Sequence, residues 1–483
     1  MRTDSTKSFI MRRPRINSRT ALAFVAVMMS LLIGALVTRE NLVRFAIATS
    51  VAFLMVVVGL RSPRVLLYGL FIWLPALGIL RRLVTTLGAA DPSGDPLLLV
   101  APAAWVLLAA VAVSRGALRQ RTALATTVLV LTLLFTVSVV NPLQGGLAVG
   151  LAGLLLVVPP MLAFWTGRSL VDDLTLRRVI GLVAWLAVPA AGYGLIQTFA
   201  GFPSWDARWI VENGYAALNV GGTIRSFASF SSAAEYATFL AFGVIAWLAL
   251  GRNMLRLPLA MAAVALLGTA LWFESSRGII VLTLAAVWLL VAARRRLPLW
   301  LALLGGVALL LALPWLVGRI APAQFADSTT SGLSLHQTQG LSDPFGKQST
   351  LPIHIAEVTG GLQEAITNPL GSGVGAVTSA ADKYGAVALG TEADPGNAAV
   401  AAGLLGLVAY LILVLRALPL AYRVAARRRD MLGVAALGIL SVAFLQWFNG
   451  AQYAVAPLPW LMLGWLDQQV ARGVSASGSE DSE

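Results

Sequence analysis

The sequence contains no cysteine and only two histidines, His336 and His354, in 483 residues. A chain without thiols can form no disulfide framework, no thiolate nucleophile and no zinc–thiolate site. Two histidines are also too few for a multi-histidine metal cluster. These absences exclude several common kinds of site, and no metal centre is expected.

Charged residues are scarce as well. They make up 12% of the chain, against 58% hydrophobic residues, whereas soluble domains carry about 25% charged residues. Apolar runs of about 20 residues recur along the sequence, and a bilayer accepts only helices or closed barrels. The sequence therefore predicts an all-α polytopic membrane protein with about fourteen transmembrane helices.

The lengths of the predicted loops divide the chain into five segments. The first span is expected at 20–38 and the last two at 431–448 and 452–467. Loops longer than about 15 residues are usually either functional or disordered. The long external loop, with its short amphipathic helices, is the predicted catalytic region. The predicted segments are a basic cytoplasmic tail (1–19), helices one to eleven (20–317) with external loops at 81–95 and 201–233, the long external loop (318–397), the last three helices (398–467) and a cytoplasmic tail (468–483).

The net charge of +13 is spread over short loops between spans. Most of the 35 lysines and arginines fall in loops assigned to the inside, which favours positive-inside topology over nucleic-acid binding and predicts cytoplasmic termini. Arginine far outnumbers lysine, and Ala, Leu and Val dominate, a composition that suggests a high-GC bacterial genome. The predicted location is thus the bacterial plasma membrane, with the active site facing outward.

Two arginines fall in short links assigned to the external face. Arg225 stands in "TIRSF", and Arg277 follows Ser276 in "FESSRGII". A guanidinium is always charged, and its planar fork suits phosphate oxygens. The two side chains either clamp an anionic, membrane-held ligand or reach out to the lipid headgroups.

Two nearby carboxylates have structural explanations. In "SAAE", Glu235 follows Ser232 by three residues, which is the spacing of a capping box at a helix start. Glu274 precedes Arg277 by three residues, which predicts a local ion pair.

The long loop contains "LPIHIAEVTGGLQEAITNPLGSGVG". Its apolar residues recur at three- and four-residue steps, which predicts an amphipathic helix across the external mouth of the bundle. The opposite polar stripe is either an ordinary solvated face or part of a site, where a charged His354 would bind phosphate and a neutral one would act as a base. The apolar stripe is Ile355, Val358, Leu362 and Ile366, and the polar stripe is His354, Glu357, Gly361 and Glu364.

A pair of carboxylates precedes the next span. Glu392 and Asp394 stand two residues apart in "GTEADPGN", close to the membrane surface. A carboxylate beside apolar spans is well suited to accepting a proton. The structural explanation is a solvated pair that caps the following helix.

Four segments, in this order and spacing, resemble one family. They are "IRSFASFSSAAEYATFLAFG", "SSRGII", "NPLGSGVG" and "GLLGLVAYL". The first is similar to the family's arginine-plus-aromatic stretch, the second to its Ser-Arg-Gly, the third to its Pro-Leu-x-Gly-x-Gly turn and the last to its Gly-x-x-Gly at the start of a span. The family is the O-antigen ligase and Wzy-type polysaccharide polymerase superfamily, and the resemblance covers about 221–410.

This resemblance implies a membrane glycosyltransferase that takes glycan from a polyprenyl-diphosphate donor, in cell-surface polysaccharide biosynthesis. Arg225 and Arg277 would bind the diphosphate, with Ser276 and Glu357 in supporting roles. Family ligases carry a histidine about ten residues before the Gly-x-x-Gly, and this chain has "TEADPGN" there. Glu392 is therefore the first choice of base and Asp394 the second. The departure favours an exopolysaccharide or capsule polymerase over a lipid A-core ligase.

The implied partners are the lipid bilayer, a polyprenyl-diphosphate-linked (undecaprenyl-diphosphate) oligosaccharide, and flippase and chain-length regulator proteins. No nucleic acid is expected as a partner. No cofactor is required, although external carboxylates and a diphosphate could recruit Mg²⁺. The competing hypothesis is a lipid-linked oligosaccharide flippase or a polysaccharide exporter. A flippase would carry charges in the middle of its spans, whereas the charges of this chain gather at the external mouth. Transfer of glycan to a protein or to another lipid would use the same residues.

Overall fold

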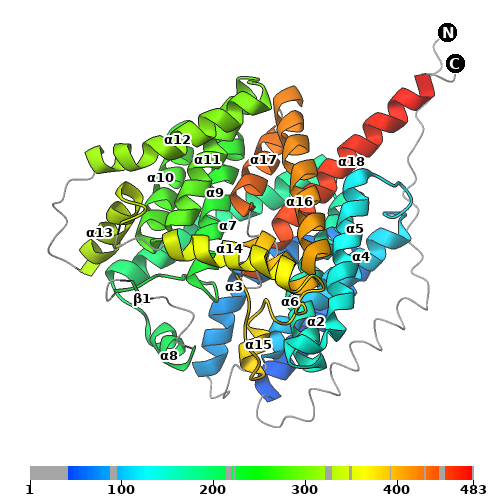
Figure 1. The fold of residues 1–483 in the computed structure, drawn as a ribbon, viewed down its shortest axis with the longest axis horizontal. Coiled ribbons are helices and arrows are strands. Elements are labelled where there is room, and N and C mark those ends of the chain that lie inside the picture. Colours follow the sequence, from blue (N-terminus) through cyan, green and yellow to red (C-terminus); the bar gives the residue numbers. More distant parts are fainter. Residues whose placement is uncertain are drawn as a thin grey trace.

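The computed structural model describes residues 42–86, 95–213, 219–220, 223–320, 329–346, 351–391, 393–428, 431–444 and 452–480. Long helices form a bundle, and shorter elements cross it or lie at one end (Figure 1). Apart from one short hairpin, the elements in the described residues are helical, which agrees with the predicted all-α polytopic class.

In the described residues, eleven helices are long and apolar enough to cross a membrane. They are α2 (Leu42–Arg61), α3 (Pro63–Thr86), α4 (Val100–Ser114, after the 3-10 turn η3, Pro96–Leu99), α5 (Ala123–Val137, before η4, Ser138–Val140), α6 (Leu147–Leu170), α7 (Asp173–Phe199), α9 (Ala233–Met254), α10 (Leu257–Glu274), α11 (Arg277–Arg294), α12 (Leu299–Ile320) and α16 (Asp394–Arg428). The other elements are η5 (Pro142–Gln144), α8 (Ser204–Asn213), the antiparallel strands β1 (Asn219–Val220) and β2 (Thr223–Ile224), α13 (Thr329–Ser342), α14 (Leu351–Thr367), α15 (Ala380–Lys383), α17 (Met431–Ala443) and α18 (Pro457–Glu480).

The expected count of about fourteen spans is matched only in part. The first predicted span, 20–38, lies outside the described residues. The predicted spans 431–448 and 452–467 fall on α17 and α18, neither of which is among the eleven. The higher count remains a prediction.

Helix α9 is the most enclosed of the eleven. Of its most apolar window, 89% is buried, compared with 6% for α12. A β carbon at Gly243 would lie 2.4 Å from Cβ of Ala187 on α7 and 2.5 Å from Cδ2 of Leu267 on α10, so glycine permits this close approach. The helix begins at Ser232, whose Oγ accepts a hydrogen bond from the amide of Glu235 at 3.2 Å, as the capping-box spacing predicts.

Helix α16 is interrupted within its length. The backbone at Gly403 is non-helical, with φ +65° and ψ −154°. The "NPLGSGVG" turn after α14 pairs with both sides of this break: the Ser372 amide donates to the Val400 carbonyl at 2.6 Å, and the Leu404 amide donates to the Pro369 carbonyl at 3.0 Å. Since hydrocarbon offers backbone groups no partner, the turn stabilises the interruption.

The same turn is held from its other side by the link between α5 and α6. The Asn141 side-chain amide donates to the Gly371 carbonyl at 2.7 Å. The side-chain oxygen of Gln144, a buried residue, accepts from the Gly375 amide at 2.9 Å. The predicted turn therefore ties three parts of the bundle together.

The predicted amphipathic helix exists as α14, which crosses in front of α16 (Figure 1). Its apolar stripe, however, is not the face packed on the protein, because Ile355 is 45% exposed and Ile366 is 81% exposed. The packed face includes Gly361, where a β carbon would lie 2.6 Å from Cα of Gly396 on α16. Because glycines allow α14 and α16 to approach closely, α14 buries the face that carries Gly361 and leaves its apolar stripe exposed.

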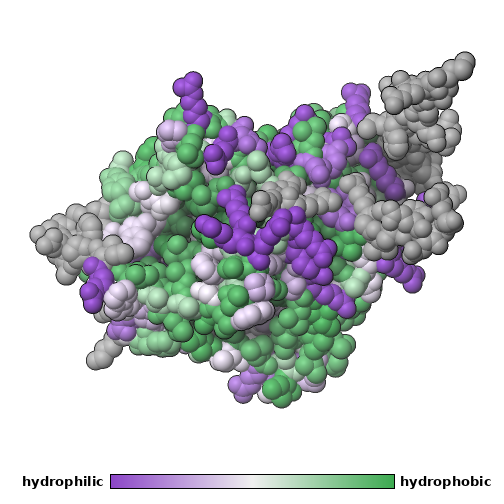
Figure 2. All heavy atoms as spheres, turned by 90° about the horizontal axis from the view of Figure 1, so that it is seen from above, coloured by the Kyte–Doolittle hydropathy of each residue, from purple (hydrophilic) through white to green (hydrophobic). Residues whose placement is uncertain are grey.

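Figure 2 views the end of the bundle from which α18 emerges. Hydrophilic side chains gather in a band across this end, with apolar side chains around it. Such a division is expected where a helical bundle leaves the hydrocarbon layer, because charged side chains need water or headgroups.

Candidate functional site

Arg225 lies between strand β2 and helix α9, and it is 7% exposed. Its Nε donates to the Glu274 carbonyl at 2.8 Å, and its Nη2 donates to Oγ of Ser276 at 2.8 Å. The same Nη2 forms an ion pair with the Glu274 carboxylate. Burial places Arg225 away from the headgroup-facing position that a snorkelling side chain would take.

The link between α10 and α11 folds around this carboxylate. Ser275 adopts the left-handed conformation, with φ +72°. The Ser276 amide donates to the second carboxylate oxygen of Glu274 at 3.0 Å. Both oxygens of Glu274 are thus engaged, one by the Arg225 guanidinium and one by the Ser276 amide. The local pair with Arg277 that helical spacing predicted stays a prediction.

Arg277 opens α11 and extends toward α13. A β carbon built at Gly340 of α13 would lie 1.4 Å from its Nη1, so the guanidinium rests directly on this glycine. Helix α13 is held beside the link by Trp272, whose indole donates to Oγ of Ser334 at 3.3 Å and whose carbonyl accepts from Gln337 at 3.4 Å. Helix α13 therefore packs over the arginine-bearing link.

His336 on α13 belongs to the same group, which the sequence did not indicate. Its side chain is half-buried. Burial lowers the pKa of the His336 imidazole below its ordinary value of 6.5, and the charges of Arg277 and Arg225 lower it further. The lowered pKa favours the neutral form of the imidazole, which can accept a proton.

A second pair of arginines, Arg81 and Arg82 of α3, lies against the segment that follows Arg225. Arg82, at the end of α3, donates to the Phe230 carbonyl at 2.6 Å and forms an ion pair with Asp206 of α8 at 2.7 Å. Arg81 pairs with Asp95 at 2.7 Å. These buried charges are compensated by carboxylates, so they fix the segment after Arg225 and do not serve as an open anion site.

Gln197 of α7 and Glu235 of α9 complete this support. Oε1 of Gln197 accepts from the amides of Phe227 and Ala228 at 3.0 and 2.7 Å. The buried carboxylate of Glu235 accepts from the amide of Ala454 at 2.8 Å, so it joins α9 to the segment before α18. Capping, which the sequence predicted, is therefore only part of the role of Glu235.

The predicted carboxylate bases lie around α14 and α16. Asp394 is the first residue of α16 and is fully buried, and the Tyr410 hydroxyl lies 3.5 Å from its Oδ2. It is thus not the solvated cap of the structural explanation. Glu357 is half-buried on α14. Glu392 lies outside the described residues, and His354 is placed only as a backbone position in α14.

The geometry brings Arg225, Arg277 and Ser276 together and adds Glu274 and His336. Two guanidinium groups, one carboxylate and a neutral imidazole leave an excess of positive charge, which suits an anionic ligand. Within the described part of the chain, no group of three or more histidine or acidic residues is arranged to hold a metal ion.

Comparisons with known proteins leave the family open. No family model matches this chain, and no curated protein sequence matches it. The functional argument therefore depends on the residues and their arrangement.

Proposed function

We propose that this protein is a membrane glycosyltransferase of the O-antigen ligase and polymerase type, acting on a polyprenyl-diphosphate-linked glycan at the external face. One observation supports this function best: Arg225, Arg277 and His336 come from three separate parts of the chain and lie close enough to interact electrostatically. The sequence motifs around both arginines support the same function.

In this proposal, the arginines stabilise the diphosphate leaving group. Charge accumulates on the diphosphate as the glycosidic bond breaks, and preorganised cations lower the energy of that state. Glu274 and Ser276 hold Nε and Nη2 of Arg225, so phosphate would meet its Nη1. Arg277 would supply the second contact. The lipid-linked donor provides the energy, and neither a nucleotide nor Mg²⁺ is needed.

The acceptor hydroxyl must lose a proton during transfer. Glu392 and Asp394 remain candidates from the sequence, with His354 as a further one. We add His336, which lies on α13 beside the arginine-bearing link and whose pKa is lowered by burial and, to a smaller extent, by the charges of Arg277 and Arg225. Direct attack by the activated hydroxyl would invert the anomeric carbon.

Reconstitution tests the function. Purified protein in vesicles is given an undecaprenyl-diphosphate oligosaccharide, and the glycan is sized. A ladder of longer glycans supports a polymerase, and transfer of one glycan to another acceptor supports a ligase. Movement of the lipid-linked sugar across the bilayer with unchanged glycan length would instead identify a flippase or exporter.

The role of His336 predicts a pH dependence. Because its pKa is lowered below 6.5, the imidazole stays neutral at pH 7 and above, and kcat/KM should fall as the pH drops through that lowered pKa. His336→Gln should reduce kcat/KM by about 10²- to 10⁴-fold and remove the acidic limb of the profile. His354→Gln tests the other histidine among the candidate bases, and it should retain the limb if His336 is the base. An unchanged limb in His336→Gln would exclude His336 as the base.

A further inference from the structure

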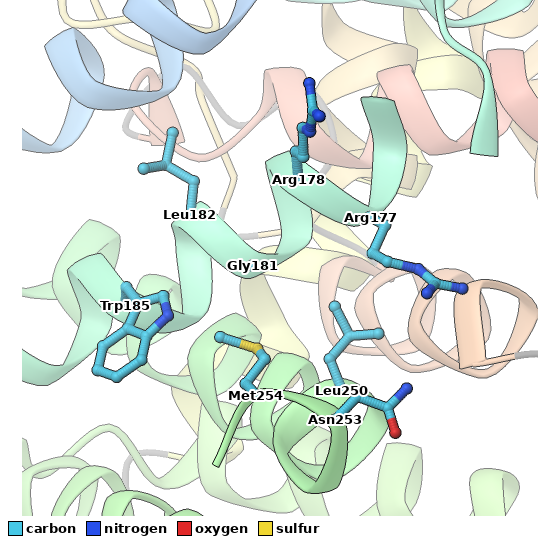
Figure 3. Close-up of a pocket in the computed structure, with 8 residues that line it drawn as sticks. All are labelled: Arg177, Arg178, Gly181, Leu182, Trp185, Leu250, Asn253 and Met254. Carbon is cyan, nitrogen blue, oxygen red and sulfur yellow. The ribbon is translucent and has the colours of Figure 1, made fainter. Parts of the chain in front are cut away.

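A groove lies between the first turns of α7 and the last turns of α9, at the opposite end of α9 from Arg225. It has a volume of about 390 Å³ (Figure 3). Its α7 side follows one strip of the helix, from Arg177 and Arg178 through Leu182 to Trp185. At 1.5 Å per residue, this strip is about 12 Å long.

The polar groups of the groove gather at one end. Arg177 and Arg178 are near the start of α7, and Asn253 is in the last turn of α9. Arg177 extends on the side of Leu250 and Asn253 in Figure 3, while Arg178 leaves α7 in another direction. Both arginines are exposed, and in the described part of the chain neither has an ion pair.

The two acidic residues at the start of α7 each contact a residue outside the groove. Asp172 forms an ion pair with Arg64 at 2.7 Å, and Asp173 accepts a hydrogen bond from the Trp465 indole at 2.9 Å. In the described part of the chain, neither of these carboxylates forms an ion pair with Arg177 or Arg178.

The inner part of the groove is apolar. Leu182, Trp185 and Met254 line it, and Trp185 is 48% exposed although it packs edge-on against Trp247. An exposed tryptophan two turns along a helix from a pair of arginines is typical of the boundary between headgroups and acyl chains. The arginine-rich flanks of both helix ends predict the cytoplasmic side for this groove.

We propose that the groove binds one anionic phospholipid of the cytoplasmic leaflet. Its phosphate would contact Arg177, with Asn253 as a hydrogen-bond donor, while Arg178 would add positive charge at the mouth of the groove. One acyl chain would lie along Leu182 and Trp185. Basic pockets between transmembrane helices recognise such headgroups. Free phosphate would leave the apolar part unused, so the groove fits the lipid as a whole. The bound lipid holds α7 against α9 and stabilises the folded protein.

Thermal unfolding in zwitterionic detergent, with added long-chain phosphatidylglycerol, tests this site. A ligand of the folded state raises the melting temperature with concentration. The Arg177→Gln/Arg178→Gln variant should bind about 30-fold more weakly, from the usual contribution of basic residues near anionic lipid. The matched control, Arg294→Gln/Arg295→Gln, removes equal charge from the end of α11 and should respond like the wild type.

Two further probes separate the sources of the anion. Inorganic phosphate and short-chain phosphatidylglycerol should give little stabilisation at the same concentrations. An equal shift with either probe would overturn the acyl-chain contact. Equal shifts in the wild type and the α7 variant would overturn the site. Because glycan transfer is not measured, this outcome is independent of the proposed function.

Discussion

Replacing Arg277 by alanine is expected to lower the rate of glycan transfer by about 10²- to 10³-fold, the usual cost of removing one charge-stabilising donor. Arg277 is the better of the two arginines for this test. Arg225→Ala would leave the buried Glu274 carboxylate without its ion-pair partner, at a cost of about 3–5 kcal/mol. Loss of activity in Arg225→Ala could then reflect unfolding, and Arg225→Ala/Glu274→Gln is the fairer variant.

The measurement is the initial rate of transfer from the polyprenyl-diphosphate donor, with folding checked by thermal unfolding. Arg208→Ala is the matched control, since Arg208 is an exposed arginine on α8 paired with Glu212. Gly340→Ala gives a second test without changing charge, because its β carbon would displace the Arg277 guanidinium, and a small misplacement can cost up to about 10²-fold. Wild-type rates in both Arg277→Ala and Gly340→Ala would remove Arg277 from the site.

Gly403→Ala is expected to have the largest effect on stability. Its backbone angles belong to a region that only glycine adopts readily, and a residue held there costs about 1–3 kcal/mol. In addition, the new β carbon would lie 1.9 Å from the Pro369 carbonyl oxygen, a backbone atom that cannot move without the turn. We expect a loss of roughly 3 kcal/mol or more.

Thermal unfolding and hydrogen exchange measure this effect. The amides of Ser372 and Leu404 should lose protection, because their bonds cross the break. Gly360→Ala on α14 is the matched control, since a β carbon there meets nothing within 4 Å, and it should be neutral or slightly stabilising. Equal melting temperatures for the two variants would contradict the role assigned to the turn.

The sequence was sufficient to predict what depends on run length and local spacing. Apolar runs gave the membrane class, and the spacing of Ile355 and Leu362 gave a helix at α14. The link positions of Arg225 and Arg277, 52 residues apart, predicted that the two links lie on one face, and in the structure Arg225 bonds Glu274 and Ser276 of the link that precedes Arg277. These inferences need only helix geometry and the preference of charge for one side of a bilayer.

The remaining features depend on contacts between distant segments. His336 stands in a stretch without a motif, and only the docking of α13 brings it near the arginines. Arg81 and Arg82 were assigned to a loop, yet carboxylates from 95 and 206 allow them to be buried. The break at Gly403 lies in an apolar run, and run length cannot distinguish a continuous helix from an interrupted one.

The interruption of α16 also has a consequence for biogenesis. Residues 368–375, which pair with the break, precede α16 in the chain and are synthesised before it. A ribosome delivers segments to the membrane in this order, so the turn has already been synthesised when the broken helix inserts. In a circular permutant that began at α16, the break would be synthesised before the turn that pairs with it.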